Sequence, residues 1–362
     1  MNKAPSKRVD LLDCGRLLAA LTVVCFHYFY NGIRNGKIIG GEYSTYITPV
    51  AMYGYLGVDL FFMISGYVIF FSARGRSARE FAISRLVRIL PAFWGAVIIT
   101  TCVAQFIGTP ETSVTLKQAL ANLTLYPNIF HQKFVDGVYW TLIYEVQFYA
   151  LVGALLCTPL RRHLNVIALG WPFAIALTRL ADHSNLPYLS TVHSFFAAGA
   201  VFAVLKTEKG TFAYVSLALA LALCITDAMG NVADPGSPYM RSPLIMAAII
   251  VAMFVFFGIA DTRWGLAQRI PGAEWAGRMT YPIYLVHAHV GYMVLSHLGT
   301  SAIGYAVAFT FAFLLALALH LSVEVAMRDF WRQTFTKVAV TLTELLPAPA
   351  LASLTESRAN RE

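Results

Sequence analysis

The sequence predicts an all-α integral membrane protein of about ten transmembrane helices, and three features of its composition support this prediction. Apolar residues make up 58% of the 362 residues, the mean hydropathy is +0.62 and only 13% of residues are charged. Soluble domains carry about twice that charged fraction. Aromatic residues reach 14%, which is typical of rings at membrane interfaces. A soluble fold could not cover this apolar surface, so much of it must face lipid.

Apolar runs give the predicted helices in order along the chain. The predicted spans are 13–31, 50–72, 89–108, 139–159, 164–180, 190–205, 211–229, 242–260, 278–298 and 301–325. The shortest are near the lower limit of about 17 residues for a helix that crosses a bilayer. An even number of spans places both termini on the same side of the membrane. The longest connection, 109–138, contains an amphipathic stretch at 114–130 that we expect to lie along the outer interface.

The positions of the basic residues predict the orientation of these spans. Of the 27 Lys and Arg residues, 20 fall in the segments on one side and 6 in those on the other, while Arg16 lies within the first span. Short loops rich in Lys and Arg stay in the cytoplasm, so we expect both termini to be cytoplasmic and the protein to cross a bacterial inner membrane. The net charge of +8 is therefore a topology signal, and we expect no nucleic-acid partner.

We expect one transmembrane domain over residues 1–346, followed by a disordered cytoplasmic tail at 347–362 that is rich in Ala, Ser and charged residues. No segment outside the spans is long enough for a separate soluble domain. The five cysteines are odd in number and contain no CxxC pair, so we predict neither a disulfide framework nor a metal site. The first span contains Arg16 and His27 and lacks a small-residue cleavage site, which argues against a cleaved signal peptide.

Ionisable side chains inside the predicted spans are costly, so each one marks a candidate functional site. Arg16 and His27 lie eleven residues apart in the first span, which places them on one helix face about 16.5 Å apart along the axis. Asp13, three residues before Arg16, is expected to pair with it. If Arg16 is near the cytoplasmic surface, His27 lies beyond the midplane, where it is either catalytic or a hydrogen-bond partner between helices.

The fourth span supplies Glu145, a few residues from its outer end and therefore at a predicted depth similar to that of His27. Tyr149 follows four residues later on the same face. Glu145 could act on His27, or it could be a structural partner for Arg16. Trp140 and Tyr149 are further candidates, although aromatic residues in spans mostly pack or lie at the interface.

Polar residues in the other spans complete the set of candidates. The second span carries Asp59, which is more readily explained as structural, and Ser65 in a small Ser-Gly step. The ninth span carries His287, for which a hydrogen bond between helices is favoured over a chemical role. Arg85 and Arg88 precede the third span and would face the same way in a helix. Two guanidinium groups suit a phosphate, unless these residues are only cytoplasmic anchors.

At these residues the sequence resembles the acyltransferase-3 family of membrane acyltransferases, which modify lipopolysaccharide O-antigen, exopolysaccharides, nodulation factors and macrolides. Five segments carry the resemblance, in order over nearly the whole chain: Arg16 and His27 with ten residues between them, and the stretches at 57–66, 85–91, 140–149 and 280–287. One motif alone would be weak, whereas five in order are specific. Some members add a soluble esterase-like domain at the C-terminus, and we expect none here.

The resemblance implies an acyl-CoA donor, most simply acetyl-CoA, on the cytoplasmic side and a carbohydrate or lipid-linked glycan acceptor. It also implies that Arg16 and His27 are essential and that Arg85, Arg88 and Glu145 take part. The arginines would clamp the CoA phosphates. His27 would deprotonate the acceptor hydroxyl or itself become acylated, with Glu145 orienting the imidazole. Membrane lipid is the other expected partner, and no metal or permanently bound cofactor is expected.

Two other function classes stay open on the sequence alone. A transporter or flippase could use an intramembrane His and Glu as a proton relay, although the chain has no inverted repeat and no paired Gly/Pro-broken helices. A membrane scaffold or sensor is the third class. Cleavage of acetyl-CoA by the purified protein separates an enzyme from both, and the sequence names neither the acceptor nor the position acylated.

Overall fold

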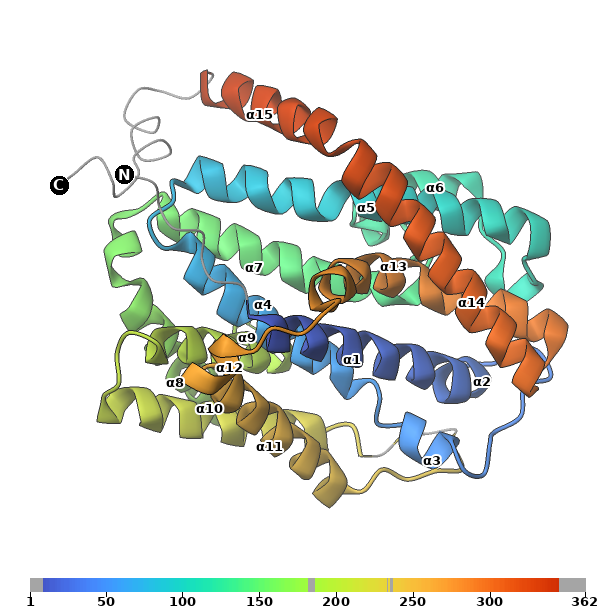
Figure 1. The fold of residues 1–362 in the computed structure, drawn as a ribbon, viewed down its shortest axis with the longest axis horizontal. Coiled ribbons are helices and arrows are strands. Elements are labelled where there is room, and N and C mark those ends of the chain that lie inside the picture. The colour runs from blue at the N-terminus through green and yellow to red at the C-terminus, as the bar shows by residue number, and fades with distance from the viewer. Residues whose placement is uncertain (1–8, 182–185, 233, 235–236, 345–362) are drawn as a thin grey trace.

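The computed structural model describes residues 9–181, 186–232, 234 and 237–344, and every regular element within these residues is helical (Figure 1). Eight helical segments in this part of the chain are long and apolar enough to cross a membrane. The predicted fold class is therefore confirmed: the protein is an all-α integral membrane protein. The predicted tail at 347–362 lies outside the described residues.

All ten predicted apolar runs lie on helices. In chain order these are α1 (Asp10–Phe26), α4 (Leu56–Ala73), α5 (Ala78–Ile107), α7 (Trp140–Leu156), α8 (Leu164–Leu180), α9 (Thr191–Leu205), α10 (Thr211–Met229), α11 (Pro243–Ala260), α13 (Ala273–Leu298) and α14 (Ala302–Leu319). Eight of them belong to the candidate membrane spans; the other two are α9, with 15 residues, and α13. Ten membrane crossings and cytoplasmic termini stay predictions.

The long helices form a bundle in which α9 and α13 are the most enclosed. In Figure 1, α1 and α4 lie between α5 and α7 on one side and α8, α10 and α11 on the other. Every residue is buried at 193–205 of α9 and at 283–295 of α13. Because protein rather than lipid surrounds these stretches, they can be shorter or more polar than a helix that faces lipid.

The third long helix, α5, begins at Ala78 and not at residue 89, which corrects the predicted boundary. A capping box starts it: the Glu80 N–H donates to Ser77 Oγ at 3.2 Å, and the Ser77 N–H donates to Glu80 Oε2 at 3.0 Å. Charged residues in the first three turns interrupt the apolar pattern and obscured this start. Arg85 and Arg88 are consequently helical and do not belong to a loop.

Two glycines bring α4 and α9 into direct backbone contact. A Cβ atom added at Gly66 would collide with the carbonyl oxygen of Phe196, and one added at Gly199 would collide with that of Met63. Backbones approach this closely only where side chains are absent, as at many helix contacts in membranes. The contact fixes α4, whose other faces line the candidate site.

A further helix, α15 (Arg328–Glu344), follows α14 through a π-helical turn at His320–Ala326. It was not among the predicted spans. Trp331 and Phe335 of α15 pack against Trp94 of α5, with ring centroids 5.8 and 6.3 Å apart. These aromatic contacts attach α15 to the bundle alongside α5 (Figure 1).

The amphipathic stretch predicted at 114–130 forms α6 (Leu116–Asn122) and a 3-10 turn at Pro127–Phe130. Large apolar side chains here face outward, and Leu116 is 72% exposed in the isolated chain. Such exposure suits a segment that lies in a membrane interface. Trp94 of α5 donates to the Leu123 carbonyl oxygen at 2.9 Å and holds the segment against the bundle.

Candidate active site

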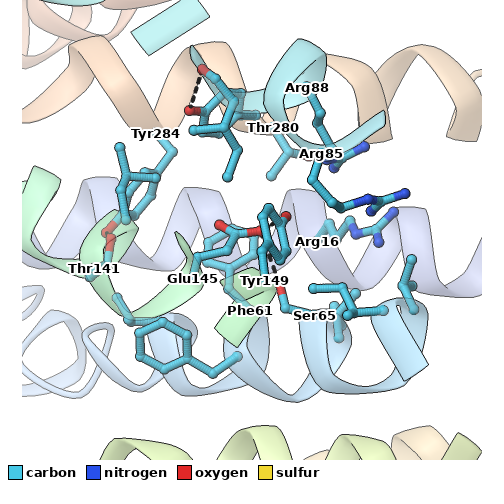
Figure 2. A pocket seen from close by; sticks show the side chains of 18 of the residues that line it. Arg16, Phe61, Ser65, Arg85, Arg88, Thr141, Glu145, Tyr149, Thr280 and Tyr284 are labelled. Atoms are coloured by element: carbon cyan, nitrogen blue, oxygen red, sulfur yellow. Dashed lines mark hydrogen bonds between the residues drawn. The ribbon is translucent and has the colours of Figure 1, made fainter. Parts of the chain in front are cut away.

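One cavity of the bundle gathers the arginine residues that the sequence singled out (Figure 2). It is lined from α1, α4, α5, α7 and α13, and its empty space amounts to about 820 Å³ when the solvent at its open mouth is included. In Figure 2 the three guanidinium groups point toward the same side of the cavity. We call it the arginine pocket and define it by Arg16, Ser65, Arg85, Arg88, Glu145 and Tyr149.

The guanidinium groups in the arginine pocket have unused hydrogen-bond donors. Among the described residues, no carboxylate oxygen lies within 4.0 Å of the side-chain nitrogens of Arg85 or Arg88. Arg85 lies 5.8 Å from the ring centroid of Tyr149. Arg16 Nη1 donates to Asp13 Oδ1 at 3.0 Å, which confirms the predicted pairing. Three guanidinium groups together suit an anion with several oxygens, such as a phosphate.

Glu145 lies in the arginine pocket and not beside His27, which corrects the depth expected from the sequence. Its Oε1 accepts hydrogen bonds from Tyr149 Oη at 2.5 Å and from Ser65 Oγ at 3.4 Å. The reason is that only the first residue of α7, Trp140, lines the histidine pocket, whereas Glu145, more than one turn further along, has reached the arginine pocket. The alternative from the sequence, that Glu145 is a structural partner for Arg16, places it in the same pocket as Arg16, although its hydrogen bonds are to Tyr149 and Ser65.

A second cavity contains His27 and lies next to the first. Its empty space amounts to about 1270 Å³ when the solvent at its open mouth is included. Its ionisable residues besides His27 are one lysine and three aspartates, so its formal charge is opposite to that of the arginine pocket. We call it the histidine pocket and define it by His27, Asn31, Lys37, Asp59, Trp140 and Tyr292.

His27 begins a π-helical turn, His27–Asn31, that continues α1 into the short helix α2 (Gly32–Arg34). Single π turns are often found at functional sites. The His27 Nδ1 lies 2.5 Å from Tyr292 Oη and 3.2 Å from Asn31 Nδ2, and Asn31 Nδ2 lies 3.1 Å from the same Tyr292 oxygen. The other ring nitrogen, Nε2, has no hydrogen-bond partner among the described residues and is not enclosed, so it faces the pocket.

Small residues let α1 and α13 approach closely enough for this contact. A Cβ atom added at Gly291 would collide with the ring of Tyr28, and one added at Gly32 would come within 2.5 Å of the Tyr292 ring. Helices in membranes use glycine in this way to bring backbones together. The two glycines therefore set the separation at which the phenol of Tyr292 reaches His27.

His287 lies beside His27 but lines neither pocket. The two ring centroids are 5.0 Å apart, and His287 is fully buried. Its Nδ1 donates to the carbonyl oxygen of Tyr284 on its own helix at 2.8 Å, and its own carbonyl oxygen accepts from Tyr28 Oη at 2.9 Å. These are the contacts of a packing residue between helices, which is the interpretation that the sequence favoured.

Asp59 and Trp140 line the histidine pocket. The two other aspartates of this pocket have partners: Asp136 accepts from two backbone N–H groups, and Asp227 pairs with Arg179 at 2.6 Å. Asp59 makes no hydrogen bond or ion pair with a described residue. Asp59 thus lines the pocket, and the structural role that the sequence favoured for it stays a prediction.

The two pockets meet in the interior of the bundle. Val58 of α4 and Tyr284 of α13 line both of them. The Tyr284 hydroxyl is fixed by Thr141 Oγ1 at 2.7 Å and by the Val138 carbonyl oxygen at 3.2 Å. The arginine pocket and the histidine pocket therefore adjoin at these two side chains.

Sequence reasoning missed Asn31 and Tyr292, which contact His27. His27, Asn31 and Asn35 follow one another at intervals of four residues, and this spacing on one helix face could have revealed the asparagines. No local pattern points to Tyr292, which comes from a distant helix. Among the described residues, no group of three His, Cys, Asp or Glu side chains could hold a metal ion.

Comparison with known proteins places the chain among acyltransferases. The family model for an acyltransferase domain matches residues 9–323. The exopolysaccharide production protein ExoZ of Rhizobium meliloti is 27% identical over 65% of this chain and 75% of its own length. The peptidoglycan O-acetyltransferase OatA of Listeria monocytogenes is 23% identical over 78% of this chain and 49% of its own length. The chain thus spans about half the length of OatA.

No solved structure matches the chain. The family match covers nearly all of the helical bundle, including both pockets. A multi-pass membrane protein with this domain is an O-acyltransferase. The chain therefore belongs to the acyltransferase-3 family of membrane acyltransferases.

Proposed function

We propose that this protein transfers an acetyl group from cytoplasmic acetyl-CoA to a hydroxyl group of an exported polysaccharide at the bacterial inner membrane. The observation that carries the proposal is the meeting of the two pockets at Val58 and Tyr284. A cationic site for the donor and a histidine site for the acceptor adjoin at these two side chains. Neither substrate has to cross the whole bundle for the reacting groups to meet.

The arginine pocket suits the donor. CoA carries several phosphate groups, and Arg16, Arg85 and Arg88 offer planar guanidinium groups that bind phosphate oxygens in pairs. The distribution of Lys and Arg predicts that this end of the bundle faces the cytoplasm, where CoA is found. Arg16 and His27 are about 16.5 Å apart along their helix, a distance that the pantetheine arm can span.

The histidine pocket suits a carbohydrate. Asp59 and Asn31 can bind sugar hydroxyls, and the Trp140 ring can pack against the apolar face of a sugar ring. Two relatives are named as an exopolysaccharide production protein and a peptidoglycan O-acetyltransferase, which supports a polysaccharide acceptor. A pocket that opens away from the cytoplasm would receive that acceptor after its export.

The chemistry requires a base at the point where the substrates meet. His27 is the base that finally receives the proton of the acceptor hydroxyl as the acceptor oxygen attacks the thioester carbonyl carbon. The carbon–sulfur bond breaks, the acetyl group stays on the acceptor oxygen and the CoA thiolate takes up the proton. Holding the two substrates in line supplies much of the remaining rate enhancement.

Mass spectrometry of the cell's surface polysaccharides, with and without this protein, tests the proposal. We expect one sugar to lose its acetyl group when the protein is absent. The purified protein should release free CoA thiol from acetyl-CoA, and faster when acceptor is added. Unchanged acetylation, together with no cleavage of acetyl-CoA by the purified protein, would refute the proposal and favour a transport function.

A further inference from the structure

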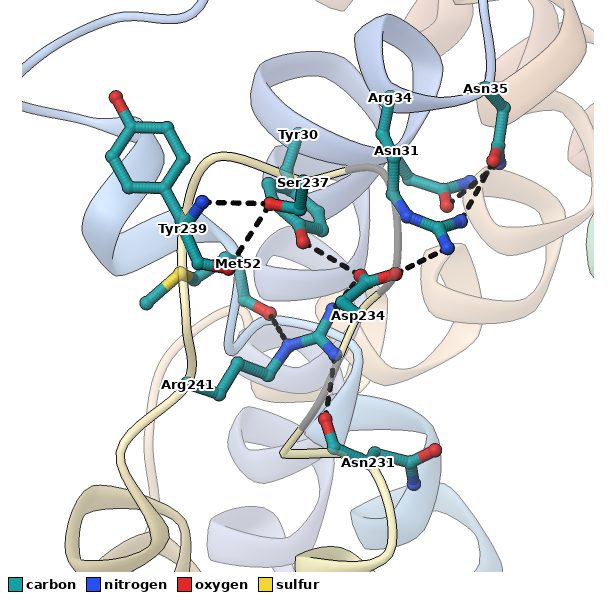
Figure 3. Close-up of polar contacts among 10 residues, drawn as sticks. All are labelled: Tyr30, Asn31, Arg34, Asn35, Met52, Asn231, Asp234, Ser237, Tyr239 and Arg241. Atoms are coloured by element: carbon teal, nitrogen blue, oxygen red, sulfur yellow. Dashed lines mark hydrogen bonds and ion pairs between the residues drawn. The ribbon is translucent and has the colours of Figure 1, made fainter.

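A chain of hydrogen bonds leads from Arg34 to His27 at the end of α1, and Figure 3 shows its first members. Arg34 Nη1 donates to Asn35 Oδ1 at 2.9 Å, and Asn35 Nδ2 donates to Asn31 Oδ1 at 3.0 Å. Asn31 Nδ2 lies 3.1 Å from Tyr292 Oη and 3.2 Å from His27 Nδ1. Tyr292 Oη is 2.5 Å from that same nitrogen, where the chain ends.

The chemistry of Arg34 fixes the orientation of the two asparagine side chains in this chain. A guanidinium group has no acceptor, so Asn35 must present its carbonyl oxygen to Arg34 and its N–H to Asn31. Asn31 then accepts with its own carbonyl oxygen and turns its N–H groups toward Tyr292 and His27. The Tyr292 oxygen accepts from Asn31. Because an N–H of Asn31 also approaches Nδ1, that nitrogen carries the lone pair, and the Tyr292 O–H donates to it. In the neutral imidazole, Nδ1 is therefore the acceptor and Nε2 carries the proton.

Arg34 is itself held by an anchor at this end of the bundle (Figure 3). It forms an ion pair with Asp234, which also accepts from Tyr30 Oη at 2.7 Å and from Arg241 Nη2 at 2.9 Å. Arg241 is only 6% exposed, and its two other nitrogens donate to backbone carbonyl oxygens. A donor held by this many contacts keeps the direction of the chain fixed before substrate binds.

We infer that Tyr292 is a catalytic residue that relays the proton of the acceptor hydroxyl to His27, an inference that rests on the proposed function. The O–H bond of the acceptor breaks and its proton binds the Tyr292 oxygen, while the O–H bond of Tyr292 breaks and its proton binds Nδ1. The acceptor oxygen attacks the thioester carbon, the carbon–sulfur bond breaks and the CoA thiolate takes a proton from the imidazolium. The products are the acylated acceptor and free CoA thiol.

Tyr292 is placed for this role. It is only 3% exposed, yet it lines the histidine pocket beside His27. A phenol oxygen has one donor and two acceptor positions, so one acceptor position is left for the incoming hydroxyl after the bonds to His27 and Asn31 are made. The Asn31 N–H stabilises the negative charge that develops on this oxygen. The Lys37 ammonium, 6.0 Å from the ring centroid, acts in the same direction.

The same bond directions argue against a covalent acyl-histidine intermediate. Nδ1 of His27 is blocked by Tyr292 and Asn31, and Nε2 carries a proton in the neutral ring. Neither nitrogen then presents a lone pair to the thioester carbon. The Nε2–H, which faces the pocket, instead donates to the thioester carbonyl oxygen and stabilises the charge that this oxygen gains during attack.

Tyr292→Phe tests the relay, and Tyr305→Phe is its matched control. Tyr305 packs on Phe29 with ring centroids 4.0 Å apart, lines neither pocket, and has a buried hydroxyl without a hydrogen-bond partner among the described residues. Both variants and the wild type are assayed for transfer from radiolabelled acetyl-CoA to oligosaccharides prepared from the cell's own polysaccharide after O-deacetylation. Binding of acetyl-CoA alone is measured separately.

We expect Tyr292→Phe to lower turnover by roughly 10²-fold or more, the size of general-base catalysis, while its affinity for acetyl-CoA stays at the wild-type value. Tyr305→Phe should match the wild type in both measurements. Because two protons move in one step, the wild-type rate should depend on the fraction of deuterium oxide along a curve rather than a line.

Two results would overturn the relay and leave acyl transfer standing: wild-type turnover in Tyr292→Phe, or a linear dependence of the wild-type rate on deuterium oxide. Loss of acetyl-CoA binding together with turnover in Tyr292→Phe would also overturn it, because the effect would then be structural. If the wild-type protein transferred no acetyl group to the oligosaccharides, the proposed function would fail and the relay with it.

Discussion

The arginine pocket and the histidine pocket share four of their helices but carry opposite formal charge. Three guanidinium groups and one carboxylate line the first, whereas one ammonium group and three carboxylates line the second. Four helices, α1, α4, α7 and α13, contribute side chains to both. One bundle thus provides a site for an anionic donor and a site for a polyhydroxylated acceptor, with Val58 and Tyr284 at their boundary.

Because each pocket is expected to bind a different substrate, a substitution in one pocket should affect only one of the two substrates. A change in the arginine pocket should alter the binding of acetyl-CoA, and a change in the histidine pocket should alter the chemical step or the binding of the acceptor. Separate KM values for the two substrates, together with kcat, distinguish these cases when chemistry is slow relative to dissociation. A variant that affects the substrate of the other pocket would break the comparison.

His27→Gln should have the largest effect. Glutamine can still hydrogen-bond to Tyr292 and Asn31, but it cannot take up a proton at neutral pH. We expect turnover to fall by at least roughly 10²–10⁴-fold, while insertion into the membrane and acetyl-CoA binding are kept. The measurement is acetyl transfer from labelled acetyl-CoA in membranes matched for protein level. Turnover near the wild-type value would show that His27 only packs between helices.

Arg85→Ala and Arg88→Ala should each weaken acetyl-CoA binding with little effect on the KM for the acceptor. Losing a charge-assisted hydrogen bond of about 1.5–3 kcal/mol raises the KM for acetyl-CoA by roughly 10- to 100-fold. Lysine should restore only part of the loss, because it lacks the planar fork. If isothermal titration gave wild-type acetyl-CoA affinity for both alanine variants, these residues would be topology anchors only.

Glu145→Gln should have a smaller effect, confined to the donor. The amide oxygen can still accept from Tyr149 and Ser65, so folding should be kept, but the negative charge among the arginines is lost. We expect CoA to bind roughly threefold to tenfold more tightly and turnover to fall severalfold, because the product leaves more slowly. If the KM for the acceptor changed while the affinity for CoA did not, Glu145 would act through His27 and not through the donor site.

Asp59→Asn should have the smallest effect of these variants. The amide keeps one acceptor oxygen but loses the charge, so one hydrogen bond to a sugar hydroxyl is weakened by about 0.5–1.5 kcal/mol. The KM for the acceptor should rise by roughly twofold to tenfold, with no change in the KM for acetyl-CoA. If the KM values for the acceptor and for acetyl-CoA were both unchanged, Asp59 would have a structural role only.

Local sequence patterns predicted the helices and the arginine pocket well. Each apolar run lies on a helix, because backbone N–H and C=O groups in lipid or in the protein interior must be hydrogen-bonded within the segment. The pairing of Asp13 with Arg16, and the shared direction of Arg85 and Arg88, follow from spacings of three residues within one helix. These relations depend only on helix geometry, so one sequence suffices to predict them.

The histidine pocket was predicted less well, because tertiary packing decides its contents. Tyr292 reaches His27 from a helix 265 positions away in the chain, through a close approach that depends on Gly32 and Gly291. Glu145 was expected beside His27, but α7 passes from the histidine pocket at Trp140 to the arginine pocket at Glu145. Neither the approach of two helices nor the depth of a residue within the bundle is encoded in local spacing.

Transfer across a sealed vesicle tests most directly the claim that the two pockets serve one reaction from opposite sides. The protein is reconstituted with O-deacetylated oligosaccharide trapped inside, and labelled acetyl-CoA, which does not cross lipid, is added outside. We predict acetylation of the trapped oligosaccharide by those molecules whose arginine pocket faces outward, no acetylation by His27→Gln, and none when donor and acceptor are both outside. Acetylation only when both substrates are on the same side would contradict the account.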